Sequence, residues 1–511
     1  MPDLDASPAS QKNSISNYIL GMRPALRLGV CLLLAGVAAT GQAPLGFWPV
    51  SILALGAIYG IFSLGWSGWG SAWIGLAAGT GYYLVSLSWI VEPFLIDAKA
   101  HAWMAPFALV FLAVGLGLFW MVAFGVARKC GGGALAWIAT LTMAEAVRGT
   151  VFTGFPWAQV GHVWIDTPVL QWASVAGSLG LTVLVLFGAV TCLWLCTGRR
   201  LIGTVALCFL VGIYLAAPLI NPYIAVPENA PIVRLVQPNA PQHEKWDPEK
   251  VQGFYNRQVS YTAAGDPPDL VVWPETAVPV LLNNPGETFN HIAKAARGAP
   301  VVLGAQRVDG LQFYNSLAVI GAQGQVTTTY DKHHLVPFGE YLPMGDFLAQ
   351  FGLTGLAAKN GNGYSAGPGA QLIDVPGLGK ALPLICYEAV FPQDVASAPE
   401  RPDFLLLITN DAWFGDVSGP HQHLAQARLR SVEQALPMIR AANTGVSAMI
   451  DSRGEVTGHL PLGTAGWLDV SLPPAGKVSI YGRTGDWPVL IFVLVLLGVS
   501  MARHRGINRP I

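Results

Sequence analysis

The run Leu384-Ile385-Cys386-Tyr387-Glu388 ends an apolar, strand-like segment in a cysteine and a glutamate. Cys386 is the only cysteine between residues 226 and 486. The other five lie in the apolar N-terminal half: Cys31, Cys130, Cys192, Cys196 and Cys208. An isolated cysteine is most often a small buried hydrophobe. In an oxidising compartment, however, a thiol without a disulfide partner is a liability unless chemistry requires it.

The composition predicts a membrane part and a soluble part. The chain has 511 residues, too many for one ordinary domain. Apolar residues make up 52% of it and charged residues 12%, against about 25% charged in soluble domains. The net charge of -1 gives no reason to expect a nucleic-acid partner, and we find no nucleic-acid motif. Charged residues are rare up to about residue 220 and ordinary from 226 to 486.

Eight apolar segments are candidate membrane spans, each of which needs about 17 to 25 residues. They are 26–44, 47–65, 69–91, 103–126, 133–149, 169–196, 201–220 and 487–502. The fifth is the weakest, because Glu145 and Arg148 lie at its end. The N-terminus is not expected to be a cleavable signal peptide, because apolar segments continue beyond it.

Basic residues predict the orientation. Clusters flank the apolar segments at Lys12, Arg23 and Arg27, at Arg128 and Lys129, at Arg199 and Arg200, and at Arg503, Arg505 and Arg509. With seven spans at 26–220 and one at 487–502, all four clusters fall on one side, which the positive-inside rule makes cytoplasmic. The tails 1–25 and 503–511 are then cytoplasmic, and the domain at 226–486 is periplasmic, on a bacterial inner membrane. An even number of spans before that domain reverses the orientation.

The soluble half reads as an α/β domain. Short apolar runs bounded by Pro, Gly, Asn or Asp predict buried strands at 232–236, 270–273, 301–304, 316–320, 381–386, 404–409 and 446–450. Helical patterns lie at 248–264, with Asp247 as N-cap, at 287–297 and at 421–440. Such alternation predicts sheets covered by helices. It leaves open a single doubly wound sheet or a four-layer sandwich.

Three strand-like runs are followed by residues that could act together chemically. Glu275 follows the run at 270–273, Lys332 follows Tyr330-Asp331, and Cys386 ends the run at 381–386. Active sites of α/β folds gather at the carboxyl ends of strands. A carboxylate can take the thiol proton, the thiolate can attack a carbonyl, and an ammonium can stabilise the resulting oxyanion.

These motifs resemble those of a known superfamily. Trp273-Pro274-Glu275, Asp331-Lys332-His333 and Cys386-Tyr387-Glu388 are similar to the three signature motifs of the nitrilase, or carbon–nitrogen hydrolase, superfamily. The resemblance implies a Glu–Lys–Cys triad on an α-β-β-α sandwich. The fold expected for the chain is therefore a multi-pass α-helical membrane domain plus an α/β nitrilase-like domain.

Apart from its N-terminal tail, the whole chain resembles the apolipoprotein N-acyltransferase family. The resemblance is carried by the spans and by the stretches 236–239, Lys245-Trp246, 332–341 and 410–415. Pro238 departs from the glycine expected there, and it touches no triad residue. The resemblance implies that Cys386 takes an acyl chain from the sn-1 position of a membrane phospholipid as a thioester. The α-amino group of an apolipoprotein's diacylglyceryl-cysteine then accepts the chain.

The resemblance also implies the roles of individual residues. Glu275 is the general base, Lys332 stabilises the oxyanion, and Cys386 is the nucleophile. The supporting residues are Glu340, which orients Lys332 or shares the proton transfer, and Tyr387 and Glu388, which flank the nucleophile. The expected lipid contacts are Trp246, Trp413 and Phe414. No cofactor and no metal are expected, and the protein is expected to be a monomer.

Simpler interpretations exist for several of these residues. Alone, Glu275 would be a solvated carboxylate, Lys332 a surface cation, and Trp413 and Phe414 packing residues. His333 and His334 are adjacent on a loop and so point in different directions, which disfavours a Cys–His pair or a metal site. His421 and His423 are expected on a solvated helix face. Lys332 is expected to lower the pKa of Cys386.

Two other functions are also compatible with this sequence. A membrane-tethered amidase or nitrilase would use the same triad with water as the acceptor, although a small soluble amide needs no membrane spans. A transporter or sensor would not require Cys386 and would carry charged residues within its spans. Apart from Glu145 and Arg148, the spans hold almost none.

Overall fold

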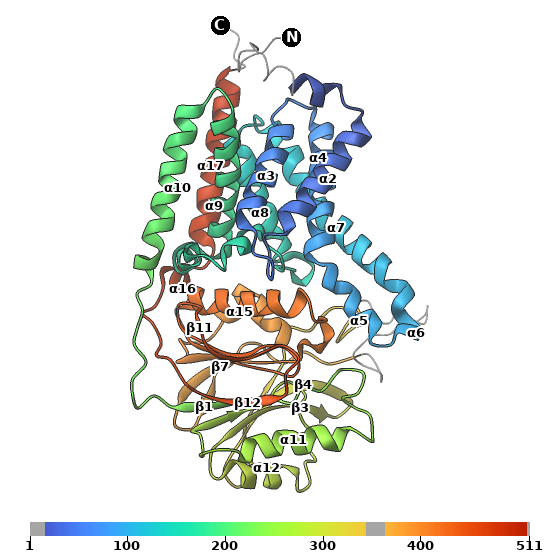
Figure 1. Ribbon diagram of the computed structural model, residues 1–511, viewed down its shortest axis with the longest axis vertical. Helices are drawn as coiled ribbons and strands as arrows, with labels where there is room; N and C mark the ends of the chain where they lie inside the picture. The colour runs from blue at the N-terminus through green and yellow to red at the C-terminus, as the bar shows by residue number, and fades with distance from the viewer. Residues whose placement is uncertain (1–15, 344–362, 508–511) are drawn as a thin grey trace, which may run out of the picture. The chain divides into compact units, whose positions relative to one another are not determined.

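The computed structural model describes residues 16–343 and 363–507, which form two compact units (Figure 1). Unit 1 comprises Met1–Val91, Trp103–Ile220 and Thr484–Ile511, and unit 2 comprises Glu92–Ala102 and Asn221–Arg483. Lys12 and Arg509, which contribute to the predicted basic clusters, lie outside the described residues, as do the ends of both predicted tails.

Unit 1 is helical, and its main helices lie at the predicted apolar segments. They are α2 (Pro24–Ala39), α3 (Trp48–Phe62), α4 (Gly68–Ser86), α7 (Ala105–Lys129), α8 (Ala134–Arg148), α9 (Ala173–Cys196), α10 (Arg200–Ile220) and α17 (Trp487–Ile507). Glycines let α4 pack closely on its neighbours. A Cβ at Gly81 would collide with the backbone of Leu32 in α2, and one at Gly75 with that of Trp120 in α7.

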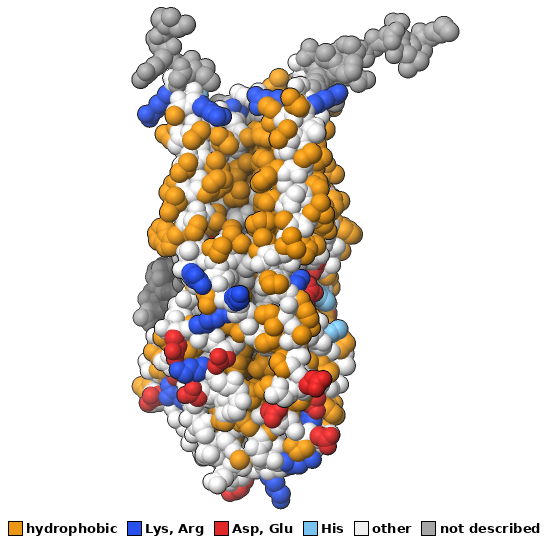
Figure 2. All heavy atoms as spheres, turned by 90° about the vertical axis from the view of Figure 1, so that its left-hand side faces the viewer, with side chains coloured by type: hydrophobic (Ala, Val, Ile, Leu, Met, Phe, Trp, Pro, Cys, Tyr) orange, Lys and Arg blue, Asp and Glu red, His pale blue; other side chains and the backbone are white. Residues whose placement is uncertain are grey.

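The helices of unit 1 have the composition of a membrane domain. Among the described residues, four helices are long and apolar enough to cross a membrane, or five if the bent pair Gly68–Ser86 and Ser88–Leu95 is one span. Helices α2 and α3 are apolar but shorter. Figure 2 shows hydrophobic side chains covering the visible face of these helices, and Leu201, Leu215 and Leu219 of α10 are among the exposed ones. The number of crossings stays a prediction.

Unit 2 contains two six-stranded mixed sheets. One has the order β12-β1-β2-β3-β4-β5 and the other β11-β10-β9-β8-β7-β6. The strands are β1 (Ile232–Gln237), β2 (Leu270–Val272), β3 (Val301–Asp309), β4 (Gln312–Ile320), β5 (Val326–Asp331), β6 (Ile373–Val375), β7 (Gly379–Ile385), β8 (Phe404–Thr409), β9 (Met438–Ala442), β10 (Ser447–Ile450), β11 (Val456–Leu460) and β12 (Gly466–Ser471). In each sheet three central strands are parallel, β1-β2-β3 and β7-β8-β9. Their carboxyl ends therefore share one edge of the sheet.

Helices cover the outer face of each sheet, so the α-β-β-α sandwich is confirmed. On the first sheet lie α11 (Val251–Ala263) and α12 (Thr288–Ala296), and on the second α14 (Pro392–Ala396) and α15 (Gly419–Gln434). Phe289 and Ile292 of α12 pack with Val271 and Trp273 in one core. Ala427 of α15 packs with the β7 and β8 leucines in the other. Burying such side chains supplies most of the folding free energy of the unit.

The structure corrects several predicted boundaries. The helix predicted at 421–440 ends at Gln434, because Ala435 is left-handed (φ +51°), and β9 begins at Met438. Helix α11 begins at Val251, and Asp247 accepts a hydrogen bond from the Glu249 N–H before the helix. Strands β5, β6, β9, β11 and β12 were not predicted.

Arg234 of β1 ties the first sheet to its edge strand, β12. Its guanidinium is fully buried and donates to both oxygens of Asp469, at 2.7 and 2.6 Å, and to the carbonyl of Thr262 at 2.9 Å. Arg234→Met leaves Asp469 and the carbonyls without their donor, which costs about 3–5 kcal/mol. The melting temperature should fall by on the order of 10 °C.

Circular dichroism of the full chain in detergent measures this shift. The matched control is Lys477→Met, which removes an exposed cation from the same unit. Equal melting temperatures for the two variants would contradict the assigned role of Arg234.

Candidate active site

The structure brings the three predicted catalytic residues together in unit 2. Glu275 follows β2, Lys332 follows β5, and Cys386 follows β7. Cys386 opens the short helix η6 (Cys386–Val390) with a left-handed backbone (φ +50°). Electrostatic effects of Glu275 and Lys332 both reach the Cys386 thiol. One carboxylate, one ammonium and one thiol thus share a buried site.

Two carboxylates flank the ammonium of Lys332. Its Nζ lies 2.8 Å from Glu340 Oε2 and 3.9 Å from Glu275 Oε1. Asn315 of β4 joins the two acids, because its Nδ2 donates to Glu275 Oε1 at 2.6 Å and to Glu340 Oε1 at 3.1 Å. The other oxygen of Glu275 accepts from the backbone N–H of Asn410 at 2.8 Å. These contacts fix both carboxylates.

The turn that carries Glu275 depends on close packing behind it. Lys245 donates from Nζ to the carbonyl of Glu275 at 3.1 Å and to Thr276 Oγ1 at 3.0 Å. Thr276 is left-handed (φ +45°), which costs a non-glycine residue about 1 kcal/mol or more. Gly304 of β3 leaves room for the turn, since a Cβ there would collide with the backbone of Glu275 and Thr276. Lys245 therefore holds the backbone of the proposed base.

Glu388 connects the nucleophile to the lysine loop. Its Oε2 accepts from the N–H of Ile385 at 2.7 Å. Its Oε1 accepts from the N–H groups of His333 and His334, at 2.8 and 3.2 Å, and from the Tyr330 hydroxyl at 2.8 Å. Glu388 is fully buried. One side chain thus positions residues on both sides of the site.

Electrostatics set the resting protonation states. Burial raises the pKa of Glu275, Lys332 opposes this, and Glu340 raises it further. Burial lowers the pKa of Lys332, but Glu340 and Glu275 outweigh burial and raise it, so the ammonium stays charged. Burial raises the pKa of the Cys386 thiol, Glu275 adds to this, and Lys332 opposes it. The expected lowering is therefore wrong, and a base must remove the proton during attack.

The histidines differ in their surroundings. His333 Nδ1 lies 2.8 Å from Glu388 Oε1, and His334 Nδ1 lies 2.6 Å from Asp394 Oδ2. Burial lowers the pKa of His333, but hydrogen bonds to Asp394 and Glu388 outweigh it and raise the pKa to about 10. His423 is fully buried, so its predicted place on a solvated face is wrong. Its Nε2 lies 3.2 Å from the Cys386 carbonyl oxygen.

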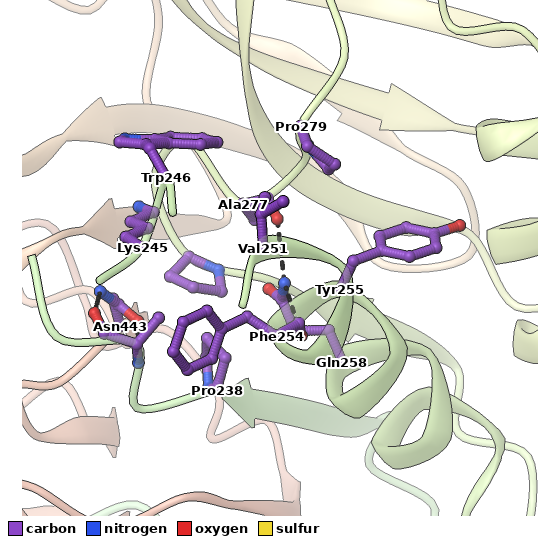
Figure 3. A pocket seen from close by; sticks show the side chains of 12 residues that line it. Pro238, Lys245, Trp246, Val251, Phe254, Tyr255, Gln258, Ala277, Pro279 and Asn443 are labelled. Atoms are coloured by element: carbon purple, nitrogen blue, oxygen red, sulfur yellow. Dashed lines mark hydrogen bonds between the residues drawn. The ribbon is translucent and has the colours of Figure 1, made fainter. Parts of the chain in front are cut away.

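The predicted lipid contacts are spread over two places. Trp246 is 45% exposed and lines a small pocket with Phe254, Tyr255 and Lys245 (Figure 3). Prolines and Ala277 complete much of the wall, so it is largely apolar. Trp413 is half-buried in η7 (Asp411–Trp413), and Phe414 is buried with its ring edge-on to that of His423. Their contact with lipid stays a prediction.

Sequence reasoning missed several residues of the site. Asn315 lies in β4, just before the predicted strand 316–320, and gave no local signal. Lys245 and Asn410 lie in stretches that carried the family resemblance, but no role was assigned to them. Asp411 and Arg440 contact His423 only through the tertiary fold.

Tyr387, which was predicted as a supporting residue, is buried next to Cys386 and packs edge-on against Phe391.

Comparisons with known proteins agree with this architecture. Residues 232–476 match the carbon–nitrogen hydrolase family model, and residues 34–191 match that of the apolipoprotein N-acyltransferase N-terminal domain. An apolipoprotein N-acyltransferase of Sinorhizobium medicae (strain WSM419) is 40% identical, with coverage of 78% of this chain and 79% of that protein. One from Rhizobium meliloti (strain 1021) is 39% identical, with coverage of 84% and 87%.

A CN-hydrolase superfamily protein from Xanthomonas campestris is similar in structure, with a TM-score of 0.35 and 20% identity over 52% of this chain and 97% of that one. From the family models and the apolar helices, the chain combines a carbon–nitrogen hydrolase domain with a helical domain of membrane-protein composition. Because relatives that are 40% and 39% identical match it over most of its length, the chain belongs to the apolipoprotein N-acyltransferase family.

The charge of Glu340 should affect the acid limb of the pH–rate profile. If Glu275 is the base, as expected, it works only when deprotonated, so the rate should fall as the pH drops through its pKa, which burial and Glu340 raise. Glu340→Gln removes one cause of the rise and leaves Lys332 to lower the pKa. The acid limb of kcat/KM should therefore move to lower pH. Glu287→Gln, at the residue just before α12, is the control, and an unshifted limb in Glu340→Gln contradicts this coupling.

Glu388→Gln should disable the site. An amide replaces one acceptor oxygen by a donor, which then faces backbone N–H groups that need an acceptor. We expect a loss of about 2–4 kcal/mol in stability and a large loss of activity at temperatures where the variant is folded. Activity assays and thermal melts measure both, with the exposed Glu400→Gln as control. A fully active variant rules out the bridging role.

Proposed function

We propose that this chain N-acylates apolipoproteins through a thioester on Cys386, with a membrane phospholipid as donor. The observation that carries the proposal is the buried Glu275–Lys332–Cys386 constellation in a chain of this family. The acyl chain would come from the sn-1 position of the phospholipid. The acceptor would be the α-amino group of a diacylglyceryl-cysteine at the N-terminus of the apolipoprotein.

The first half-reaction loads the enzyme. Cys386 Sγ attacks the ester carbonyl while its proton passes to Glu275, and the oxyanion forms beside the Lys332 ammonium. The carbon–oxygen ester bond then breaks, the alkoxide takes the proton from Glu275, and a lysophospholipid leaves. The raised pKa of Glu275 suits this role, because a stronger base removes a proton more readily from a thiol whose pKa is also raised.

The second half-reaction transfers the chain. The neutral α-amine attacks the thioester carbonyl, its proton passes to Glu275, and the carbon–sulfur bond breaks as the amide forms. Glu275 returns the proton to the thiolate. Glu340 keeps Lys332 in place and charged throughout, through the 2.8 Å ion pair. Apolar walls that exclude water protect the thioester between the two steps.

The proposed location follows from the substrates. Both are anchored in a bilayer, and the helices of unit 1 supply a membrane anchor. Basic residues at Arg128, Lys129, Arg199 and Arg200 support a cytoplasmic side under the seven-span hypothesis. We propose an inner-membrane protein with unit 2 in the periplasm, acting as a monomer.

The proposal is tested first by intact-mass analysis after incubation with phospholipid. Wild type should gain the mass of an acyl chain, which neutral hydroxylamine removes. Cys386→Ala should gain none, and Glu275→Gln should load about 10²–10⁴-fold more slowly. Cys208→Ala, which removes an exposed cysteine elsewhere, should behave as wild type. A wild-type thiol that stays unmodified contradicts the acyltransferase proposal.

The acceptor distinguishes this function from a membrane-tethered amidase. Loaded enzyme should retain its chain in buffer and lose it when an N-terminal diacylglyceryl-cysteine peptide is added, with one amide formed per thioester lost. Rapid loss to water, independent of the peptide, would favour the hydrolase instead.

A further inference from the structure

Cys386 adopts a backbone conformation that is sterically unfavourable for a residue with a Cβ atom. Its φ of +50° lies in the left-handed region, which costs a residue with a Cβ about 1–2 kcal/mol. Such a conformation persists only where the surroundings enforce it. Because the backbone conformation sets the direction of the Cα–Cβ bond, from which Sγ extends, the groups that enforce it also help to aim the nucleophile.

Two hydrogen bonds bracket the strained residue. Before it, the N–H of Ile385 donates to Glu388 Oε2 at 2.7 Å. After it, the carbonyl oxygen of Cys386 lies 3.2 Å from His423 Nε2. A carbonyl oxygen only accepts, so we assign the hydrogen of the neutral ring to Nε2, and Nδ1 then accepts from Arg440 Nη2 at 3.3 Å. The first contact belongs to the motif around the nucleophile, whereas His423 comes from α15, 37 residues further along the chain.

His423 is itself held by a buried set of polar groups. Its Nδ1 lies 2.8 Å from Asp411 Oδ1, which also accepts from the Thr409 hydroxyl at 2.8 Å. Asp411 Oδ2 lies 2.5 Å from Arg440 Nη2. The side chains of His423, Asp411 and Arg440 are fully buried. Burial raises the pKa of Asp411, but Arg440 and His423 outweigh it and lower it to about 2, so Asp411 stays a carboxylate.

Stability alone is a weak reason for such an arrangement. Burying a charged pair costs desolvation free energy that its attraction often fails to recover, and apolar residues of similar size often do as well. Neither the proposed proton transfer nor the proposed oxyanion stabilisation uses these three side chains. Among the described residues, His423 joins this set to the predicted nucleophile through the Cys386 carbonyl.

We propose that His423, oriented by Asp411 and Arg440, is a positioning residue that holds the peptide following Cys386 and thereby aims Sγ. This role rests on the proposed acyl transfer at Cys386. The peptide group is planar, so fixing the Cys386 oxygen also fixes the N–H of Tyr387 on the other side of the same plane. Loss of the Nε2 donor frees this peptide to rotate and lets Cys386 relax from its left-handed conformation.

The test compares His423→Leu with His423→Gln in the full chain. Leucine fills similar space without a donor, whereas the glutamine amide can still donate to the Cys386 carbonyl. His421→Leu is the matched control, on the first turn of the same helix. Two rates are measured per folded molecule, with folding checked by thermal melts. One is acyl loading from phospholipid, and the other is alkylation of Cys386 by iodoacetamide, followed by peptide mass analysis.

We expect His423→Leu to load up to about 100-fold more slowly, with KM for the phospholipid unchanged. Its Cys386 should also be alkylated more slowly, and His423→Gln should recover most of both losses. Wild-type rates in His423→Leu, or equal losses in the leucine and glutamine variants, overturn the proposal. The alkylation rate decides if the two disagree. Because alkylation needs no phospholipid, it tests His423 even if wild type fails to load.

Discussion

The Glu388 carboxylate is the interaction on which the active site depends most. Catalysis by three groups from three strands requires that the strand ends keep a fixed separation. The oxygens of Glu388 accept from Ile385, just before the nucleophile, and from His333 and His334, just after the lysine. A carboxylate has two acceptor oxygens, whereas the amide of a glutamine of the same length has one acceptor oxygen and a donor group. Glu388 therefore holds the backbone before Cys386 and the backbone after Lys332 in fixed positions relative to each other.

In the resting site the charged groups are paired or hydrogen-bonded, and the thiol is protonated. Lys332 is neutralised by Glu340 at 2.8 Å, and Glu275 is held by Asn315 and the Asn410 N–H. Burial keeps the Cys386 thiol protonated. A permanently ionised thiolate would react with many electrophiles and oxidants besides the substrate. A thiol that loses its proton only to a positioned base is protected between turnovers.

The sequence predicted the parts of unit 2 that are apolar on both faces. Strands β1, β2, β7 and β8 were found because they are short apolar runs, and the predicted catalytic residues Glu275 and Cys386 follow two of them. Strand β9 was missed because the pattern of α15 continues through Leu436 and Met438, although Pro437 marks the break. Strands at sheet edges, such as β11, alternate between partly buried and exposed residues and left a weaker signal.

The finer electrostatics could not be predicted from local sequence. The pKa of Cys386 depends on burial, which arises when both sheets and their helices pack, and burial outweighs the neighbouring Lys332. Asn315, Asp411 and His423 reach the site from separate elements, so no spacing between residues indicates their contacts. The family motifs predict which side chains react, and the fold determines how those side chains are held.

The buried pair in α8 has a consequence for how the protein is made. Glu145 Oε2 lies 2.5 Å from Arg148, and Glu145 Oε1 accepts from Tyr83 of α4 and Trp120 of α7, each at 3.0 Å. On the predicted topology α8 enters the bilayer, where a charged residue costs up to about 3 kcal/mol during insertion by the translocon, the full value applying at the helix centre. Its partners are synthesised first. We therefore expect α8 to integrate efficiently only alongside α4 and α7, so the order of helices along the chain is itself part of the assembly route.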